Sequence, residues 1–163
     1  MMFDSPLRAL AEAVLAEARA QRLMLTTAES CTGGLIAALL TEIPGSSDVV
    51  ECGFVTYSNR AKTEMLGVDP ALIAAEGAVS QAVARAMAEG ALRHAKADAA
   101  VAVTGIAGPG GGTADKPIGL VHIAAARKGG ETVHRECRFG DIGRDKVRIA
   151  SVEAALQLLR ELL

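Results

Sequence analysis

Five consecutive small apolar residues, from Ala99 to Val103, constrain the fold of this chain more than any other feature. A strand with one face in water alternates polar and apolar residues, whereas a strand covered on both faces is apolar throughout. Segments with helical periodicity lie before and after this run, so helices are available to cover both faces. The run therefore predicts an α/β protein, a three-layer α/β/α sandwich with a mixed central sheet flanked by helices.

Periodicity and turn residues predict the remaining elements. Helices are expected to begin at Asp4 or Ser5, Leu35, Ser58 or Asn59, Asp69, Ser80 and near the C-terminus. Strands are expected over 23–25, 49–57, 119–126 and 132–139, the last two forming a hairpin around Gly129-Gly130. With 163 residues, half of them hydrophobic, and with no linker or repeat, we expect a single domain spanning 1–163. Because aromatic residues are nearly absent, the elements must pack closely through small side chains.

Composition excludes several classes of function. The net charge is −2 and no basic block is present, so we expect no nucleic-acid partner. Three widely spaced cysteines (Cys31, Cys52 and Cys137) include no CxxC pair, which argues against a disulfide framework and a zinc site. We therefore expect a cytoplasmic protein. The N-terminus is unlike a signal peptide and no apolar run is long enough to cross a bilayer, so no membrane is expected.

A strand, a tight turn and a helix follow one another around Ser30. The backbone N–H groups of such a turn are free and favour negative charge. Ser30 is therefore either a helix N-cap or a nucleophile with an oxyanion site beside it. Thr32 is an alternative cap, and Cys31 is an alternative nucleophile because a helix N-terminus lowers the pKa of a thiol. Gly33 and Gly34 allow a ligand to approach the backbone closely, which favours a ligand site.

Tyr57 and Lys62 form a second candidate group. Tyr57 is the only tyrosine and ends a predicted strand, and Lys62 lies in the first turn of the next helix. The helix dipole and the neighbouring Arg60 both disfavour a charged amine there, so the pKa of Lys62 is expected to be lowered. A neutral Lys62 is able to act as a general base. The alternative is an exposed lysine on a surface helix.

A glycine-rich loop, Thr104 to Pro117, follows the most buried strand. It lies at the carboxyl end of that strand, where open α/β sheets bind ligands, and its N–H groups can surround an anion. It matches neither a Walker A loop nor a dinucleotide fingerprint, and a flexible connection is the alternative. Arg144, Lys146 and Arg148 either bind a phosphate or begin a solvated helix. His122 and His134 are interpreted as structural, with no metal site.

Four segments, taken together and in this order, resemble one family: Thr26–Gly34, Val55–Lys62, Gly77–Ser80 and Thr104–Pro109. The family is the CinA C-terminal domain, the nicotinamide-nucleotide amidases, and the resemblance extends from about Leu7 to the end of the chain. It implies hydrolysis of the carboxamide of nicotinamide mononucleotide (NMN), which yields nicotinate mononucleotide and ammonia. It further implies that no metal or cofactor takes part and that the protein is a homodimer or a larger homo-oligomer.

The resemblance also assigns roles to residues. Ser30 matches the nucleophile of the family, and Tyr57 and Lys62 match the groups that assist it as proton carriers. The segment Gly140 to Arg144 is two residues longer than the corresponding family segment. Glu29 is expected either to orient the pocket or to attract the pyridinium ring. The residues expected to bind substrate are Glu29, Cys31, Thr32, Gly33, Gly34, Thr104, Gly105, Ile106, Ala107, Gly108 and Arg144.

Two alternatives remain open. One is a non-catalytic nucleotide-binding or regulatory protein that keeps only the pocket. The other is a cysteine amidase that uses Cys31. Fused relatives of the family carry a further N-terminal domain with a nucleotide pyrophosphatase role, an activity that we do not expect for this chain.

Overall fold

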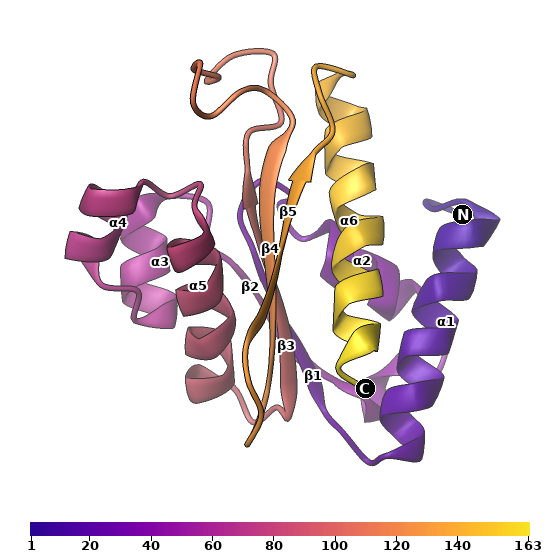
Figure 1. Cartoon of the computed structure of the whole chain (residues 1–163). Helices are drawn as coiled ribbons and strands as arrows, with labels where there is room; N and C mark the ends of the chain where they lie inside the picture. Colours follow the sequence, from indigo (N-terminus) through magenta and orange to yellow (C-terminus); the bar gives the residue numbers. More distant parts are fainter.

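One five-stranded mixed sheet forms the centre of the computed structural model, which describes residues 1–163 (Figure 1). The strand order is β2-β1-β3-β4-β5. β2, β1 and β3 are mutually parallel, whereas β4 is antiparallel to β3 and β5 is antiparallel to β4. The mixed sheet and the C-terminal hairpin that the sequence predicts are thus confirmed. The strands are β1 (Leu25–Glu29), β2 (Val50–Val55), β3 (Ala99–Gly105), β4 (Leu120–Arg127) and β5 (Val133–Arg138).

Helices cover both faces of this sheet, as the sequence predicts (Figure 1). One layer contains α1 (Ser5–Ala20), α2 (Leu35–Glu42) and α6 (Arg144–Glu161). The other contains α3 (Asn59–Leu66), α4 (Pro70–Glu76) and α5 (Gln81–His94). A short 3-10 turn, η1 (Ser46–Asp48), connects α2 to β2. No helix is both long enough and apolar enough to span a bilayer.

The central position of β3, with helices over both faces of the sheet, explains why its sequence is apolar throughout. Alternate side chains of a strand point to opposite faces, so Val101 and Val103 join the core beneath α1, α2 and α6. Ala100 and Ala102 join the second core, beneath α5. All five residues of the run are fully buried. The side chains from the sheet on the α5 face are mostly alanine, which lets that helix approach the strands closely.

Close packing continues between α5 and α3 at Gly90. A Cβ atom at this position would collide with the carbonyl oxygen of Leu66, the last residue of α3. Glycine costs about 1 kcal/mol in a helix interior relative to alanine, so its presence here is explained by the contact it permits. This contact fixes the position of α3, the helix that carries Lys62.

The carboxyl ends of the three parallel strands meet at one edge of the sheet. Val103 lies opposite Glu29, and Glu29 also lies opposite Val55. The expected strand 49–57 is shorter than predicted, because the chain leaves the sheet after the Thr56 N–H donates to the Glu29 carbonyl at 2.9 Å. Ser58 then accepts from Ala61 N at 3.0 Å and begins α3. The residues that follow these strand ends are therefore brought together.

We expect Gly90→Ala to destabilise the protein by about 1–3 kcal/mol, the usual cost of forcing extra volume into a packed core. Helix propensity alone predicts the opposite sign, a gain of about 1 kcal/mol. Urea unfolding at equilibrium measures the difference. Gly110→Ala is the matched control, because no atom lies within 4 Å of the added Cβ and Gly110 has no positive φ angle. A Gly90→Ala protein as stable as the parent would contradict this account of the α3–α5 contact.

Candidate active site

A hydroxyl and an amine meet at the edge of the sheet where β1 and β2 end. Ser30 Oγ lies 2.9 Å from Lys62 Nζ. Ser30 directly follows β1, and its N–H donates to the Val103 carbonyl at 3.0 Å, which extends the β1–β3 pairing by one residue. Ser30 is 9% exposed and Lys62 only 1%. The exposed surface lysine, which was one reading of the sequence, is therefore wrong.

Lys62 is buried without a carboxylate partner. Its Nζ donates to the Thr56 carbonyl at 2.8 Å and approaches the Tyr57 carbonyl at 3.5 Å. Burial disfavours the charged amine and lowers the pKa of Lys62. The sequence predicts the same direction, but from the helix dipole and the neighbouring Arg60. Arg60 is in fact exposed and pairs with Glu64 at 2.7 Å, so burial is the main cause.

The helix after Ser30 begins at Leu35, as predicted, but its N-cap is not one of the two residues that the sequence analysis considered. The N-cap of α2 is Gly34, which makes no side-chain capping bond, so neither Ser30 nor Thr32 caps this helix. Gly33 and Gly34 precede the helix with φ angles of 59° and 103°. Both angles are in the left-handed region that favours glycine, so backbone geometry requires these glycines.

Glu29, the last residue of β1, satisfies the free N–H groups of α2. Its fully buried carboxylate accepts from Ile36 N at 2.9 Å, from Ala37 N at 3.0 Å and from Thr32 Oγ at 2.7 Å. These contacts place Glu29 beneath the helix rather than in a cavity. Sequence reasoning missed this role, because the acceptor precedes the helix by several residues and matches no local capping pattern.

Arg148, in α6, binds the opposite side of the same turn. Its Nε donates to the Cys31 carbonyl at 3.1 Å, and its Nη2 donates to the Thr32 carbonyl at 3.2 Å. No other residue of the chain accepts a hydrogen bond from the N–H groups of Cys31 and Thr32. The backbone of Cys31, the residue directly after Ser30, thus keeps a donor that no other residue of the chain uses.

Ser30 and Lys62 open into a cavity of about 260 Å³. The cavity brings together most of the predicted site and adds Asn59, Ala78 and Val79, which the sequence analysis did not select. Glu29, Thr32, Gly33, Gly34, Ile106 and Gly108 do not line it. The lining residues are Ser30, Cys31, Tyr57, Asn59, Lys62, Ala78, Val79, Thr104, Gly105, Ala107 and Arg144.

Tyr57 and Arg144 lie together among the lining residues. Arg144 donates to the Tyr57 hydroxyl at 3.1 Å and to the Gly108 carbonyl at 2.9 Å. The two additional residues before Arg144 therefore do not prevent it from reaching the site. Tyr57 is 64% exposed, and its hydroxyl bonds neither Ser30 nor Lys62.

Cys31 also lines the cavity, but burial raises the pKa of its thiol to about 11. This direction is opposite to the lowering that the sequence predicts from the helix N-terminus. The desolvation of a thiolate outweighs the stabilisation that the Cys31 backbone N–H, Arg148 and Lys62 provide. The Cys31 thiol is therefore protonated at neutral pH, which makes it a poor nucleophile.

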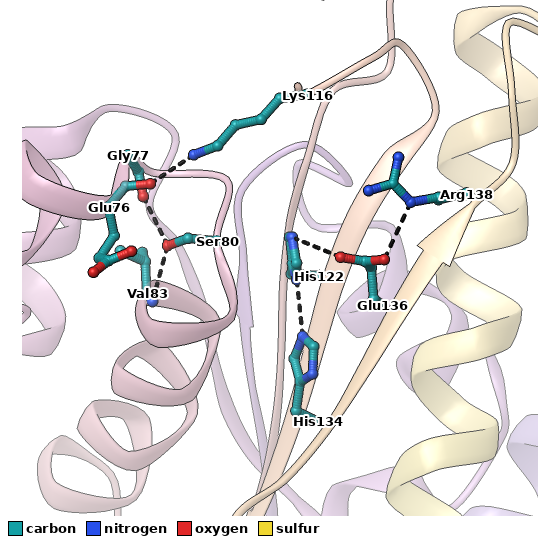
Figure 2. Close-up of polar contacts among 9 residues, drawn as sticks. All are labelled: Glu76, Gly77, Ser80, Val83, Lys116, His122, His134, Glu136 and Arg138. Atoms are coloured by element: carbon teal, nitrogen blue, oxygen red, sulfur yellow. Dashed lines mark hydrogen bonds and ion pairs between the residues drawn. The ribbon is translucent and has the colours of Figure 1, made fainter. Parts of the chain in front are cut away.

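Outside this site, His122 and His134 contact each other across β4 and β5, as Figure 2 shows. His122 Nδ1 lies 2.8 Å from His134 Nε2, and His122 Nε2 lies 3.9 Å from Glu136. Glu136 becomes a neighbour of His122 only through strand pairing, so the local sequence does not reveal this contact. The same view contains Ser80, which accepts from Val83 N at 3.2 Å and caps α5.

The sequence profile of the CinA C-terminal domain family matches residues 7–163 of this chain. Nicotinamide-nucleotide amidohydrolase PncC of Escherichia coli (strain K12) is 50% identical over 159 residues, which cover 97% of this chain and 95% of that protein. A CinA-like protein of Akkermansia muciniphila is 58% identical over 123 residues, 76% of this chain and 30% of that protein. This chain spans only about a third of such CinA-like relatives, between 30% and 36% of their length.

Solved structures agree with this similarity. The crystal structure of the competence/damage inducible protein CihA from Agrobacterium tumefaciens superposes with a TM-score of 0.98 at 52% identity, covering 99% of this chain and 98% of that one. A CinA superfamily protein from Escherichia coli superposes with a TM-score of 0.92 at 34% identity, covering 100% and 95%.

The burial of His122 and His134 leads us to expect that the free energy of unfolding depends on pH. Burial is the main cause that lowers the pKa of both imidazoles below 6.5 in the folded state. The unfolded chain therefore takes up protons first, and the free energy of unfolding falls as the pH decreases from about 7.5 to 5.5. Urea unfolding across this window measures the slope. We expect the double variant His122→Asn/His134→Gln to flatten it, whereas His94→Gln, an exposed control, should not. An unchanged slope in the double variant would contradict this assignment.

Proposed function

This chain belongs to the CinA C-terminal domain family, and on that premise we propose that it is a nicotinamide-nucleotide amidase. The proposed reaction is hydrolysis of the carboxamide of NMN to nicotinate mononucleotide and ammonia. The observation that carries the proposal is the 2.9 Å contact between Ser30 Oγ and the buried amine of Lys62, inside a cavity. The similarity to nicotinamide-nucleotide amidohydrolase PncC of Escherichia coli supports the choice of substrate.

Lys62 is the proposed general base. A neutral lysine has two N–H bonds and one lone pair. The two carbonyl oxygens of Thr56 and Tyr57 accept the N–H bonds, which leaves the lone pair for the hydroxyl proton of Ser30. Ser30 Oγ gives up its proton to Nζ and attacks the amide carbon of the substrate. The Tyr57 hydroxyl is engaged by Arg144, so Lys62 is the more direct base.

The tetrahedral intermediate places a negative charge on the former carbonyl oxygen. The N–H group of Cys31, which no other residue uses and which belongs to a residue lining the cavity, is the proposed donor to this oxyanion. Loss of such a donor typically reduces the rate by about 10²–10³-fold. The Lys62 ammonium then returns its proton to the departing nitrogen, and ammonia leaves. Water, deprotonated by the regenerated amine, cleaves the ester to Ser30 and restores the hydroxyl.

Arg144 is the proposed ligand of the substrate phosphate. A guanidinium has five N–H donors, and only two of those of Arg144 are used, on Gly108 and Tyr57. The remaining donors and the positive charge suit an anion in the cavity that Arg144 lines. Its hydrogen bond to Tyr57 holds the arginine in place.

We expect Ser30→Ala to abolish the release of ammonia from NMN. The measurement compares purified parent and variant in the presence of a metal chelator, with folding verified by circular dichroism. Ser47→Ala, an exposed serine in η1, is the matched control and should retain the parental rate. Parental turnover in Ser30→Ala would contradict the serine mechanism. Saturable NMN binding by a parent protein that releases no ammonia would instead support a nucleotide-binding module.

Lys62→Arg should reduce kcat by about 10²–10⁴-fold, the usual contribution of a general base, because a guanidinium does not release its proton. In the parent, kcat/KM should rise with pH through the lowered pKa of Lys62 and then level off, because only the neutral amine accepts a proton. Lys96→Arg serves as the control, because Lys96 is exposed and lies two residues after the end of α5. A Lys62→Arg enzyme with the parental rate and pH profile would exclude Lys62 as the base.

A further inference from the structure

The cavity that holds Ser30 contains no carboxylate. None of its lining residues is an aspartate or a glutamate, and its one arginine, Arg144, is positively charged. Glu29, which the sequence offered as a group that attracts the pyridinium ring, accepts from the N–H groups of Ile36 and Ala37 and does not line the cavity. A positively charged ring bound in this cavity therefore meets no acidic side chain.

The proposed chemistry determines where the pyridinium ring lies. In NMN the carboxamide carbon is bonded directly to this ring, so the ring lies next to the carbon that Ser30 attacks. Lys62 Nζ is 2.9 Å from Ser30 Oγ and 3.5 Å from the Tyr57 carbonyl oxygen, which places the backbone of Tyr57 close to the reacting atoms. Tyr57 also lines the cavity, whose volume is only about 260 Å³. The substrate ring and Tyr57 therefore share one small space.

Tyr57 is the only aromatic residue that lines this cavity. The chain has one tyrosine, three phenylalanines and no tryptophan, and no phenylalanine is among the lining residues. Tyr57 is 64% exposed, so its side chain packs against little of the protein and keeps surface for a ligand. The face of an aromatic ring carries partial negative charge and attracts a cation. Tyr57 thus supplies the one π face in the cavity, which favours a positively charged ring over a neutral one.

Arg144 holds this exposed tyrosine in place. Its Nη2 donates to the Tyr57 hydroxyl at 3.1 Å, and its Nη1 donates to the Gly108 carbonyl at 2.9 Å. Because the hydroxyl is the far end of the side chain, the contact restrains the whole ring. A side chain that is restrained before the ligand arrives loses less conformational freedom on binding. The hydroxyl makes no hydrogen bond to Ser30 or Lys62, so the contact does not serve proton transfer.

We propose that the ring of Tyr57 binds the pyridinium ring of the substrate through a cation–π interaction, and so selects a positively charged aromatic carboxamide over a neutral one. Tyr57 then determines specificity and is not the proton carrier that the family resemblance implies. This inference rests on the proposed function and names the feature of NMN that the cavity recognises.

Steady-state kinetics with NMN tests this role of Tyr57. Tyr57→Leu removes the π face, and we expect KM to rise by about 3–30-fold and kcat to change by less than about threefold, because the interaction is present in both the ground state and the transition state. Tyr57→Phe keeps the π face and loses the hydrogen bond to Arg144, so its KM should lie between those of the parent and Tyr57→Leu. A loss of kcat by about 10²-fold or more in both variants would identify a proton carrier and overturn the proposal.

Met65→Ala is the matched control. Met65 is an exposed apolar residue of α3, the helix that begins two residues after Tyr57, and it does not line the cavity. We expect its kcat and KM to equal those of the parent. Circular dichroism verifies the folding of each variant. If Tyr57→Leu fails to fold, Tyr57→Phe carries the test, and a folded Tyr57→Phe protein with kcat reduced by about 10²-fold would overturn the proposal.

Equilibrium binding separates this inference from the proposed reaction. In a Ser30→Ala protein, isothermal titration calorimetry compares NMN with its reduced form, whose dihydropyridine ring keeps the carboxamide and the phosphate but has no positive charge. We expect NMN to bind more tightly by about 3–30-fold, and Tyr57→Leu in the same background to remove most of this preference.

Each outcome of the binding experiment bears on one claim. No preference for NMN in the Ser30→Ala protein, or an equal preference with and without the Tyr57 ring, would overturn the role of Tyr57, even if the parent hydrolyses NMN. A preference that depends on Tyr57, in a chain whose parent releases no ammonia from NMN, would refute the proposed function but support the role of Tyr57.

Discussion

Burial of the Lys62 amine is the constraint on which the candidate site depends. A charged amine removed from water without a carboxylate partner is unfavourable, and the protein responds by lowering the pKa of Lys62. The two backbone carbonyls near Nζ satisfy N–H bonds without adding a full negative charge. An ion pair would stabilise the ammonium and remove the lone pair that a general base requires. The Lys62 amine is therefore hydrogen-bonded to backbone carbonyls but has no carboxylate counter-ion.

The fold supplies the rigidity that this arrangement requires. Alanines on the α5 face of the sheet and Gly90 in α5 let the helices approach closely, which places α3 and its lysine beside the end of β1. On the other face, Glu29 fixes the start of α2 and Arg148 fixes the preceding turn. Ser30 thus lies between two helical layers, each attached to the sheet by its own core.

Much of the fold is predictable from local patterns, because Ala99 to Val103, the capping residues and the C-terminal hairpin are signals within short windows. Ser30 and Lys62 were selected from local rule-breaking and from resemblance to a family. Glu29, Arg148 and Glu136 were given other roles or none. Their contacts join residues that are far apart in sequence or on neighbouring strands, and such pairings are determined by the tertiary fold. The pKa of Cys31 was predicted in the wrong direction for the same reason, since burial is not visible in a local window.

The contact between Arg148 and the Ser30 turn has a kinetic consequence. Contacts across a large sequence separation require closure of a long loop and form late in folding. The strands that hold Ser30 are all complete before α6 begins, but α6 must dock before the carbonyls of Cys31 and Thr32 are bound. The turn after Ser30 is therefore complete only when α6 is docked, and any local unfolding that releases α6 also releases the carbonyl groups of Cys31 and Thr32.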